Sequence, residues 1–186
     1  MGRILALDVA FSNTGWAILE YSDNEWKCLD AYVITTKPEH KKKKLRVADD
    51  DVRRSTELFA TLSAIMVQAN IKGVVAELPT GGAQGARPNR AMGMATSVAA
   101  CLVEQFKVPA EYINPNDSKK TVTGNKNASK KQVQDAIIKK YPTCTKSFKL
   151  KRGSQTEYEN KFEHAADALA AFECAKEGVL VRLLQN

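Results

Sequence analysis

Four polar residues lie in otherwise apolar or alanine-rich segments, where an enzyme could use them. Asp8 interrupts the apolar run 3–9, Glu77 interrupts the run VVAEL, and His164 and Asp167 fall in HAADALA. A carboxylate in an apolar strand is costly unless it is paired or binds a metal ion. His164 and Asp167 are three residues apart, which places both side chains on one face of a helix. The four residues are therefore candidates for a common site.

Three carboxylates from separated segments of a chain are suited to hard divalent cations. Mg²⁺ prefers oxygen ligands, and a histidine beside the carboxylates also suits Mn²⁺. Two such ions, roughly 4 Å apart, can stabilise the attacking and leaving oxygens of a phosphodiester displacement. The donor set thus predicts metal-dependent phosphodiester hydrolysis.

Each of these residues also has an ordinary structural interpretation. Asp8 could cap the turn that contains Ser12 and Asn13, and Glu77 could face solvent at the end of a strand. His164 and Asp167 could be surface residues of a helix. A structural role for all four at once is the weaker interpretation, because each of them interrupts a closely packed or apolar pattern.

The composition indicates a basic, folded protein. The 186 residues carry 28 Lys plus Arg against 21 Asp plus Glu, a net charge of +7, and 44% of them are hydrophobic. This length and apolar content suit a single domain, expected over 1–186. Excess Lys and Arg favour a polyanionic partner such as DNA, through phosphate contacts. Charge alone does not separate this interpretation from that of a basic protein with no nucleic-acid role.

The apolar pattern predicts alternating elements after an initial group of strands. Short strands joined by tight turns at the start predict an antiparallel meander. The later alternation of helix and strand predicts an α/β fold, a mixed five-stranded sheet flanked by helices on both faces. The expected strands are 3–9, 16–21, 26–36, 73–78 and 110–114, the helices 49–70, 91–106, 129–140 and 162–176, and the mobile loops about 37–48, 79–90 and 142–160.

Cysteine usage and hydropathy predict a cytoplasmic protein with no membrane partner. The cysteines at 28, 101, 144 and 174 are far apart and form no C-x-x-C pair, so neither a zinc cluster nor a disulfide framework is expected. Four reduced thiols are typical of the cytosol. Asp8 makes the N-terminal apolar run a poor signal peptide, and no apolar run is long enough to cross a bilayer.

Four blocks of the sequence resemble the RuvC-type Holliday junction resolvases of the RNase H-like nuclease superfamily. LALDVAFSNTGWAIL (5–19) looks like their opening Asp motif, and VVAEL (74–78) looks like their second motif. KKTVTGNKNASKKQVQDAI (119–137) is similar to their basic stretch, and HAADALA (164–170) looks like their last motif. The blocks occur in the family's order and cover roughly residues 1–176.

The resemblance implies an RNase H-like fold and an endonuclease that nicks four-way-junction and other branched DNA in symmetric pairs. It implies that Asp8, Glu77, His164 and Asp167 are metal ligands and catalytic residues. The cofactor would be Mg²⁺, with Mn²⁺ able to substitute and two ions in each active site. It also implies a homodimer, whose interface we expect on the small-residue helix 91–106, since a two-fold dimer matches a two-fold junction.

DNA contacts are expected from basic residues near this site. The resemblance implies that Lys119 takes part in catalysis and that Lys119 and Lys130 contact phosphates. Arg87 and Arg90 lie in the Gly-rich segment 79–90, which either orders around DNA or is merely a connection. The expected DNA-binding residues are Lys119, Lys120, Lys130, Lys131, Arg87 and Arg90.

One departure from the family concerns selectivity. Many members carry an aromatic residue after the second-motif glutamate, whereas here Glu77 is followed by LPTGG, with no aromatic residue before Phe106. Stacking of such a residue on a base is therefore not expected. The departure indicates a divergent, phage-type member with broader activity on branched DNA.

Three other functions compete with this interpretation. An actin-like or sugar-kinase-like ATPase shares the opening Asp and Gly motif but needs two lobes and a second phosphate loop, for which the chain is too short. A non-catalytic branched-DNA-binding protein would leave the carboxylate of HAADALA without a role. An RNase H-like nuclease for RNA–DNA hybrids would use the same metal site. A fold alone does not decide among them.

Overall fold

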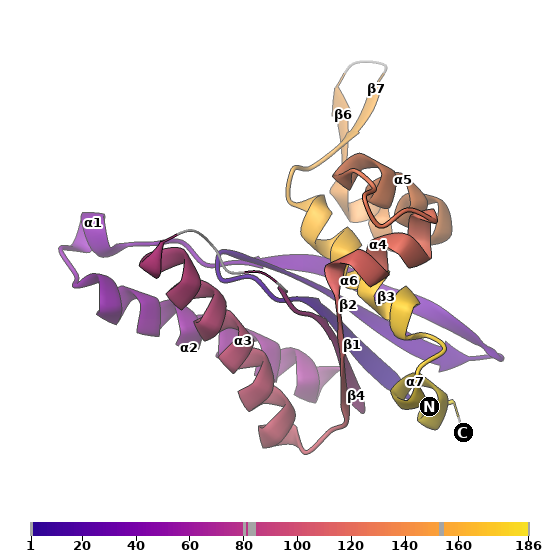
Figure 1. Cartoon of the computed structure of the whole chain (residues 1–186), viewed down its shortest axis with the longest axis horizontal. Coiled ribbons are helices and arrows are strands. Elements are labelled where there is room, and N and C mark those ends of the chain that lie inside the picture. Colours follow the sequence, from indigo (N-terminus) through magenta and orange to yellow (C-terminus); the bar gives the residue numbers. More distant parts are fainter. Residues whose placement is uncertain (1, 80, 82–84, 153–154, 186) are drawn as a thin grey trace.

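Five strands form one sheet at the centre of the molecule (Figure 1). The computed structural model describes residues 2–79, 81, 85–152 and 155–185. The strands of the sheet are β1 (Arg3–Asp8), β2 (Asn13–Ser22), β3 (Glu25–Thr35), β4 (Gly73–Glu77) and β5 (Ala110–Ile113). They lie in the order β3-β2-β1-β4-β5; β1 to β3 pair antiparallel, whereas β4 pairs parallel with both β1 and β5. The predicted mixed five-stranded sheet is therefore confirmed.

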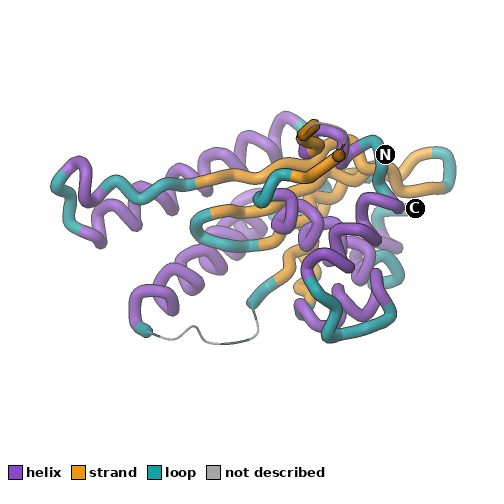
Figure 2. Tube along the Cα trace, turned by 90° about the horizontal axis from the view of Figure 1, so that it is seen from above, coloured by secondary structure: helices purple, strands orange, loops and turns teal. Residues whose placement is uncertain are grey.

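Local sequence explains how several elements begin and turn. The two-residue turn between β2 and β3 has positive φ at Asp23 and Asn24, residue types that tolerate this region. Ser129 and Gln132 form a reciprocal capping box at the start of α5. The helices are α1 (His40–Lys43), α2 (Val47–Gln68), α3 (Ala86–Phe106), α4 (Pro115–Thr123), α5 (Lys130–Lys140), α6 (Phe162–Ala175) and α7 (Val179–Leu183). Figures 1 and 2 show the two ends of the chain side by side, next to α7.

Helices cover both faces of the sheet, because side chains on a strand alternate between its faces. On β1, Leu5 and Leu7 pack in the core beneath α2 and α3, whereas Ile4 and Ala6 pack in the core beneath α6. In Figure 1, α2 and α3 lie on one side of the sheet and α4, α5 and α6 on the other. Helix α6 contains six alanines, and these small side chains let the helix lie close to the strands. The prediction of helices on both faces is confirmed.

Several predicted boundaries were wrong. Helix α3 begins at Ala86, not at residue 91, since Pro88 is tolerated in the first turn of a helix. Arg87 and Arg90 therefore lie on a helix and not in a loop. Helix α4 was not predicted, because Pro115 appeared only to end a strand; in fact the proline occupies the first turn, with Asn114 as the N-cap.

Two of the predicted loops contain regular structure. Segment 37–48 includes α1 and the start of α2. Segment 142–160 includes a 3₁₀ helix, η1 (Cys144–Phe148), and an antiparallel hairpin of β6 (Lys149–Arg152) and β7 (Gln155–Tyr158). Figure 1 shows this hairpin projecting from the side of the molecule that carries α4, α5 and α6. Thr80, residues 82–84 of the predicted loop 79–90, and residues 153–154 lie outside the described residues.

The expectation of four reduced thiols was wrong for one pair of cysteines. Cys28 on β3 and Cys144 at the start of η1 form a disulfide, with 6.0 Å between their Cα atoms. The two are 116 residues apart in sequence, so their spacing gave no sign of this contact. Cys101 and Cys174 are free thiols. Within the described part of the chain, no helix has both the length and the apolar character needed to cross a membrane.

Candidate active site

The sheet brings two of the predicted site residues to adjacent strand ends. Strands β1 and β4 are parallel neighbours, and their register pairs Asp8 with Glu77 at the last position of each strand. Parallel neighbours end at the same edge of a sheet, so the two carboxylates share one edge. The apolar runs that bury these strands thus fix the spacing of the two acids.

Helix α6 crosses this edge and supplies the other two residues. The ring nitrogen Nδ1 of His164 lies 2.8 Å from Oδ2 of Asp8. Asp167 follows one turn later on the same helix; its charge acts on Glu77, and the charge of Asp8 acts on Asp167. The structure therefore brings together all four residues that the sequence singled out.

The close approach of α6 depends on a glycine in β2. Gly15 is the antiparallel partner of Asp8, on the side away from Glu77. A Cβ atom on Gly15 would lie 1.9 Å from the carbonyl oxygen of His164 and 2.8 Å from the backbone nitrogen of Ala165. The backbone of α6 therefore rests directly on β2 beside Asp8.

The pKa values of two carboxyl groups are raised. Glu77 is 9% exposed, and burial raises its pKa to about 8, helped by the charges of Asp167 and Asp8. Burial also raises the pKa of Asp167 to about 7, with the charge of Asp8 adding to the effect. The charge of Lys119 lowers the pKa of both groups. Clustered acids with raised pKa values are typical of functional sites.

Two hydrogen bonds orient the acids. Ser118 on α4 is buried, and its hydroxyl donates to Oε2 of Glu77 at 2.5 Å, with the carbonyl oxygen of Pro115 3.1 Å from the same hydroxyl. The hydrogen bond with Asp8 raises the pKa of His164 and so favours the imidazolium form. Sequence inspection missed Ser118, because a serine in a polar stretch gives no sign that it will be buried.

The donor set fits hard divalent cations. It offers carboxylate oxygens from Asp8, Glu77 and Asp167, and their mutual repulsion would be relieved by a cation. In the part of the chain that the structure describes, no three His, Cys, Asp or Glu side chains are already arranged as ligands of one ion. Asp8 is instead held by His164. Metal binding would therefore exchange this contact for coordination.

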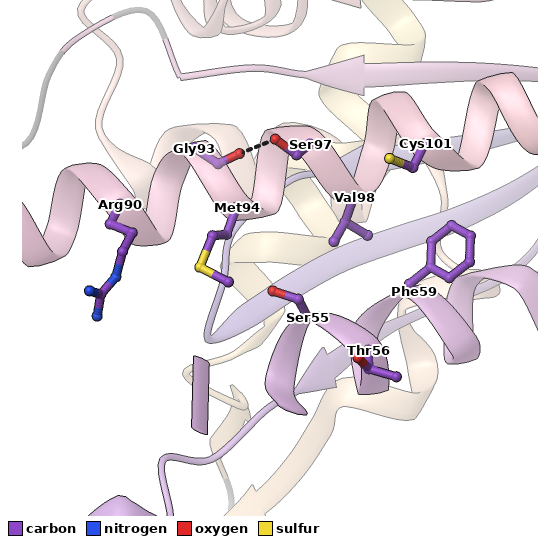
Figure 3. A pocket seen from close by; sticks show the side chains of 9 residues that line it. All are labelled: Ser55, Thr56, Phe59, Arg90, Gly93, Met94, Ser97, Val98 and Cys101. Atoms are coloured by element: carbon purple, nitrogen blue, oxygen red, sulfur yellow. Dashed lines mark hydrogen bonds between the residues drawn. The ribbon is translucent and has the colours of Figure 1, made fainter. Parts of the chain in front are cut away.

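A cleft of about 410 Å³ gives access to these groups, and Asp8, Glu77 and His164 line it. Its lining includes the turn 9–13 that follows β1 and residues at the start of α3. A larger cavity, of about 760 Å³, lies between α2 and α3 and contains none of the four site residues (Figure 3). Its lining is mostly apolar. The smaller cleft is therefore the candidate active site.

The lysines on α4 and α5 differ in their exposure and in the residues that they pair with. Lys119 is partly buried, whereas Lys120, its neighbour on α4, is exposed. Lys130 on α5 pairs with Glu163 at 3.0 Å, next to His164 on α6. Lys131 pairs with Asp135 on its own helix at 3.5 Å. The charge of Lys119 acts on both Glu77 and Asp167.

The two arginines of α3 differ in their surroundings. Arg87 is exposed. The guanidinium of Arg90 donates to Oδ2 of Asp51 on α2 at 2.5 Å, although its side chain is 46% exposed. Arg90 is thus engaged within the protein, and a DNA phosphate would have to share it with Asp51.

We expect the metal-free protein to lose stability as pH rises from about 5 to 8. The folded state binds the Glu77 proton more tightly than the unfolded state does, since the pKa rises from 4.5 to about 8. The free energy of unfolding then falls by up to about 1.4 kcal/mol per pH unit for each such proton. For a chain of this length, each kcal/mol lost lowers Tm by roughly 2–4 °C. Asp167 and His164 act in the same direction.

Thermal unfolding in EDTA at pH 5 and pH 8 tests this expectation. Glu77→Gln should raise Tm by several degrees at pH 8 and by little at pH 5. Glu104→Gln, on the exposed end of α3, serves as the matched control and should change neither value by much. An equal effect of Glu77→Gln at both pH values would contradict the raised pKa.

Comparison with known proteins supports one family. Residues 4–174 match the family described as crossover junction endodeoxyribonuclease RuvC. A protein of that name from Treponema denticola is 26% identical over 173 residues, which is 90% of this chain and 82% of the relative.

Solved structures share the fold at low sequence identity. A structure of T. thermophilus RuvC in complex with Holliday junction substrate has a TM-score of 0.68 at 16% identity, covering 94% of this chain and 92% of the other. The yeast mitochondrial Holliday junction resolvase Ydc2 has a TM-score of 0.60 at 14% identity, covering 100% of this chain and 82% of the other. Because the family match spans nearly the whole chain, this protein belongs to the RuvC family of crossover junction endodeoxyribonucleases.

Proposed function

We propose that this protein resolves four-way DNA junctions by hydrolysing one phosphodiester bond in each of two opposing strands. The observation that carries the proposal is the register of β1 and β4, which puts Asp8 beside Glu77 at one sheet edge under α6. Because its substrate would be DNA, we expect the protein to act in the cytoplasm. Branched DNA in general, not only perfect four-way junctions, is the proposed substrate class, since no aromatic residue lies between Glu77 and Phe106.

Nucleases of this family depend on divalent metal ions. We assign Asp8, Glu77, His164 and Asp167 as the residues that hold them, with Mg²⁺ or Mn²⁺ as the ion and two ions in each site. Bound ions would activate a water molecule and offset charge on the scissile phosphate. Ser118 would keep the Glu77 carboxylate oriented through its 2.5 Å hydrogen bond. Lys119 would add positive charge on the α4 side of the same cleft.

Symmetric cleavage needs two active sites, so we propose a homodimer. Its interface would be the larger cavity between α2 and α3, which forms an open groove. Figure 3 shows side chains of both helices along this groove, among them Phe59 from α2 and Met94 and Val98 from α3. The groove is open and mostly apolar, and it lies away from the carboxylates. A second copy of the same surface would cover it, as a two-fold interface requires.

Two other functions remain as alternatives that experiments can separate. A non-catalytic junction-binding protein would bind four-way junctions tightly and leave them intact in Mg²⁺ and Mn²⁺. An RNase H-like nuclease would cut an RNA–DNA hybrid faster than a junction. Cleavage of a labelled junction beside linear, forked and hybrid substrates therefore tests the proposal against both.

Lys119→Ala is expected to slow cleavage by about 100-fold, as loss of one charge that stabilises a transition state does. Lys119 is partly buried and acts on Glu77 and Asp167, so its loss also raises the pKa of both groups further. The dissociation constant for the junction should weaken only a few-fold. Single-turnover cleavage with enzyme in excess separates the two quantities.

Lys120→Ala provides the contrast. Lys120 is exposed on the same helix, and it is expected to contribute only phosphate contacts. This variant should weaken binding and reduce its salt dependence, with a single-turnover rate near that of the wild type. Equal rates for the Lys119→Ala variant and the wild type would remove Lys119 from the catalytic assignment.

A further inference from the structure

A buried arginine on α2 contacts the turn that follows Asp8. Arg54 is 5% exposed, and burial of a charged group is costly unless its hydrogen bonds are satisfied. Its guanidinium donates to the hydroxyl of Ser12 at 2.9 Å and to the hydroxyl of Thr36 at 3.1 Å. It also reaches the carbonyl oxygens of Phe11 and Thr36 at 3.4 and 3.3 Å, and lies 4.2 Å from the centre of the Phe11 ring.

These contacts fix one wall of the cleft. The turn 9–13 leads directly from Asp8 and lines the cleft that contains it. Thr36, just after β3, reinforces the same turn, since its hydroxyl donates to the Phe11 carbonyl at 2.6 Å and its amide donates to the Ser12 carbonyl at 3.0 Å. The turn is thus held by α2 and β3 together.

The contacts of Arg54 continue through Asp51 to helix α3, whose first turns also line the cleft. Asp51 is 4% exposed, and its Oδ1 atom lies 3.8 Å from Nη1 of Arg54. Its other oxygen, Oδ2, accepts the 2.5 Å hydrogen bond from Arg90. Arg90 is on α3, where Pro88, Ala91 and Met92 line the cleft. A continuous line of charged groups therefore joins the turn 9–13 to the start of α3.

We propose that Arg54 is a positioning residue for cleavage, and that the Arg54–Asp51–Arg90 line sets the distance between the turn 9–13 and the start of α3. The inference rests on the proposed function, because its catalytic consequence requires that the cleft be the active site. Among the described residues, the hydrogen bonds, ion pair and ring contact of Arg54 involve none of the four predicted metal ligands. Its effect on cleavage would pass through the backbone of the turn that follows Asp8.

A lysine cannot replace Arg54 in this role. The guanidinium offers five donors in a fixed planar arrangement, whereas an ammonium is a point charge on a flexible chain. Arg54→Lys would keep the charge opposite Asp51 and lose most of the contacts with Phe11, Ser12 and Thr36. Misplacement of catalytic groups by about 1 Å can slow a reaction by about 100-fold. We therefore expect Arg54→Lys to slow cleavage by about 10- to 100-fold.

Arg53→Lys is the matched control. Arg53 precedes Arg54 on the same helix and also makes several hydrogen bonds, to Asp50, Glu57 and the carbonyl of Lys37. None of these partners lines the cleft. The control therefore measures what the same substitution does to α2 without touching the turn.

The experiment combines three measurements on the full chain: single-turnover cleavage of a four-way junction, the junction dissociation constant, and amide hydrogen exchange of residues 9–13. For Arg54→Lys we expect slower cleavage, a dissociation constant within about threefold of the wild type, and faster exchange in the turn. Arg53→Lys should match the wild type in all three. Hydrogen exchange needs no activity, so it tests the positioning even if the wild type does not cut.

Each outcome separates the two proposals. A wild type that does not cut in either metal defeats the proposed function, and exchange then decides whether Arg54 orders the turn. A wild type that cuts, with Arg54→Lys equal to it in rate and exchange, overturns this inference and leaves the function standing. If Arg54→Lys does not fold, Asp51→Asn tests the same line, and unchanged cleavage and exchange in that variant would also overturn it.

Discussion

Asp8→Asn is expected to reduce cleavage by on the order of 1,000-fold or more, while junction binding is retained. Asp8 is central to the proposed site because it pairs in register with Glu77, borders Gly15 and contacts His164. Asparagine keeps the shape of the side chain and removes the charge that a cation needs. Binding should be equal or slightly tighter, since one negative charge near the phosphates is lost. Single-turnover cleavage and a binding titration measure the two effects.

Asp30→Asn is the control for this change. Asp30 is an exposed carboxylate on β3 with no contact to the cleft, so its loss alters net charge by the same amount. We expect it to cut at the wild-type rate. Asp167→Asn should behave like Asp8→Asn. Full cleavage by both the Asp8 and the Asp167 variants would disprove the assignment of the site.

Gly15→Ala is expected to have the second largest effect, through geometry alone. The added methyl would lie 1.9 Å from the carbonyl oxygen of His164, a backbone atom that cannot rotate away. Helix α6 would have to move off β2 by roughly 1 Å, a shift that can cost about 100-fold in rate. Overpacking of this kind also costs about 1–3 kcal/mol of stability. Cleavage rate and Tm should therefore both fall, with the rate affected more.

Gly73→Ala is a matched variant at the other end of the sheet. Its added methyl would meet the far ends of two side chains, Leu184 at 2.8 Å and Leu180 at 3.0 Å, which can adjust. We expect a modest loss of Tm and a cleavage rate near that of the wild type. If Gly15→Ala also kept the wild-type cleavage rate, the close packing of α6 on β2 would not be needed for catalysis.

The candidate site was predictable because each of its acids breaks a local pattern. Asp8 and Glu77 stand out in apolar runs, and Asp167 stands out in an Ala-rich helix. The mixed character of the sheet followed from the early hairpins and the later alternation of helices and strands, and the structure has such a sheet. Asp8 and Glu77 are adjacent because β1 pairs with β4. Consecutive strands joined by a crossover helix commonly pair in parallel in this way.

Features that depend on distant contacts were not predictable. Arg54 and Ser12 are 42 residues apart, and nothing in either local sequence indicates that they meet. The same holds for Cys28 and Cys144, which the expectation of reduced thiols treated as unrelated. Such pairs are defined by the tertiary fold, and no periodicity encodes them.

Helix α4 was missed for a different reason, although its sequence carries a usable signal. It is short and polar, so the apolar spacing that reveals amphipathic helices is absent. Asn114 as N-cap followed directly by Pro115 is nevertheless a recognised helix start. Reading this signal would have placed Ser118 and Lys119 on one helix.

The most direct test of the proposed function is cleavage of a labelled, immobile four-way junction in Mg²⁺, in Mn²⁺ and in EDTA. Linear duplex, a Y-fork and an RNA–DNA hybrid serve as comparison substrates. We predict paired nicks at symmetric positions on opposing strands of the junction, slower cutting of the fork, little cutting of the duplex or the hybrid, and no cutting in EDTA. Tight junction binding without cleavage in either metal, or faster cleavage of the hybrid than of the junction, would contradict the account.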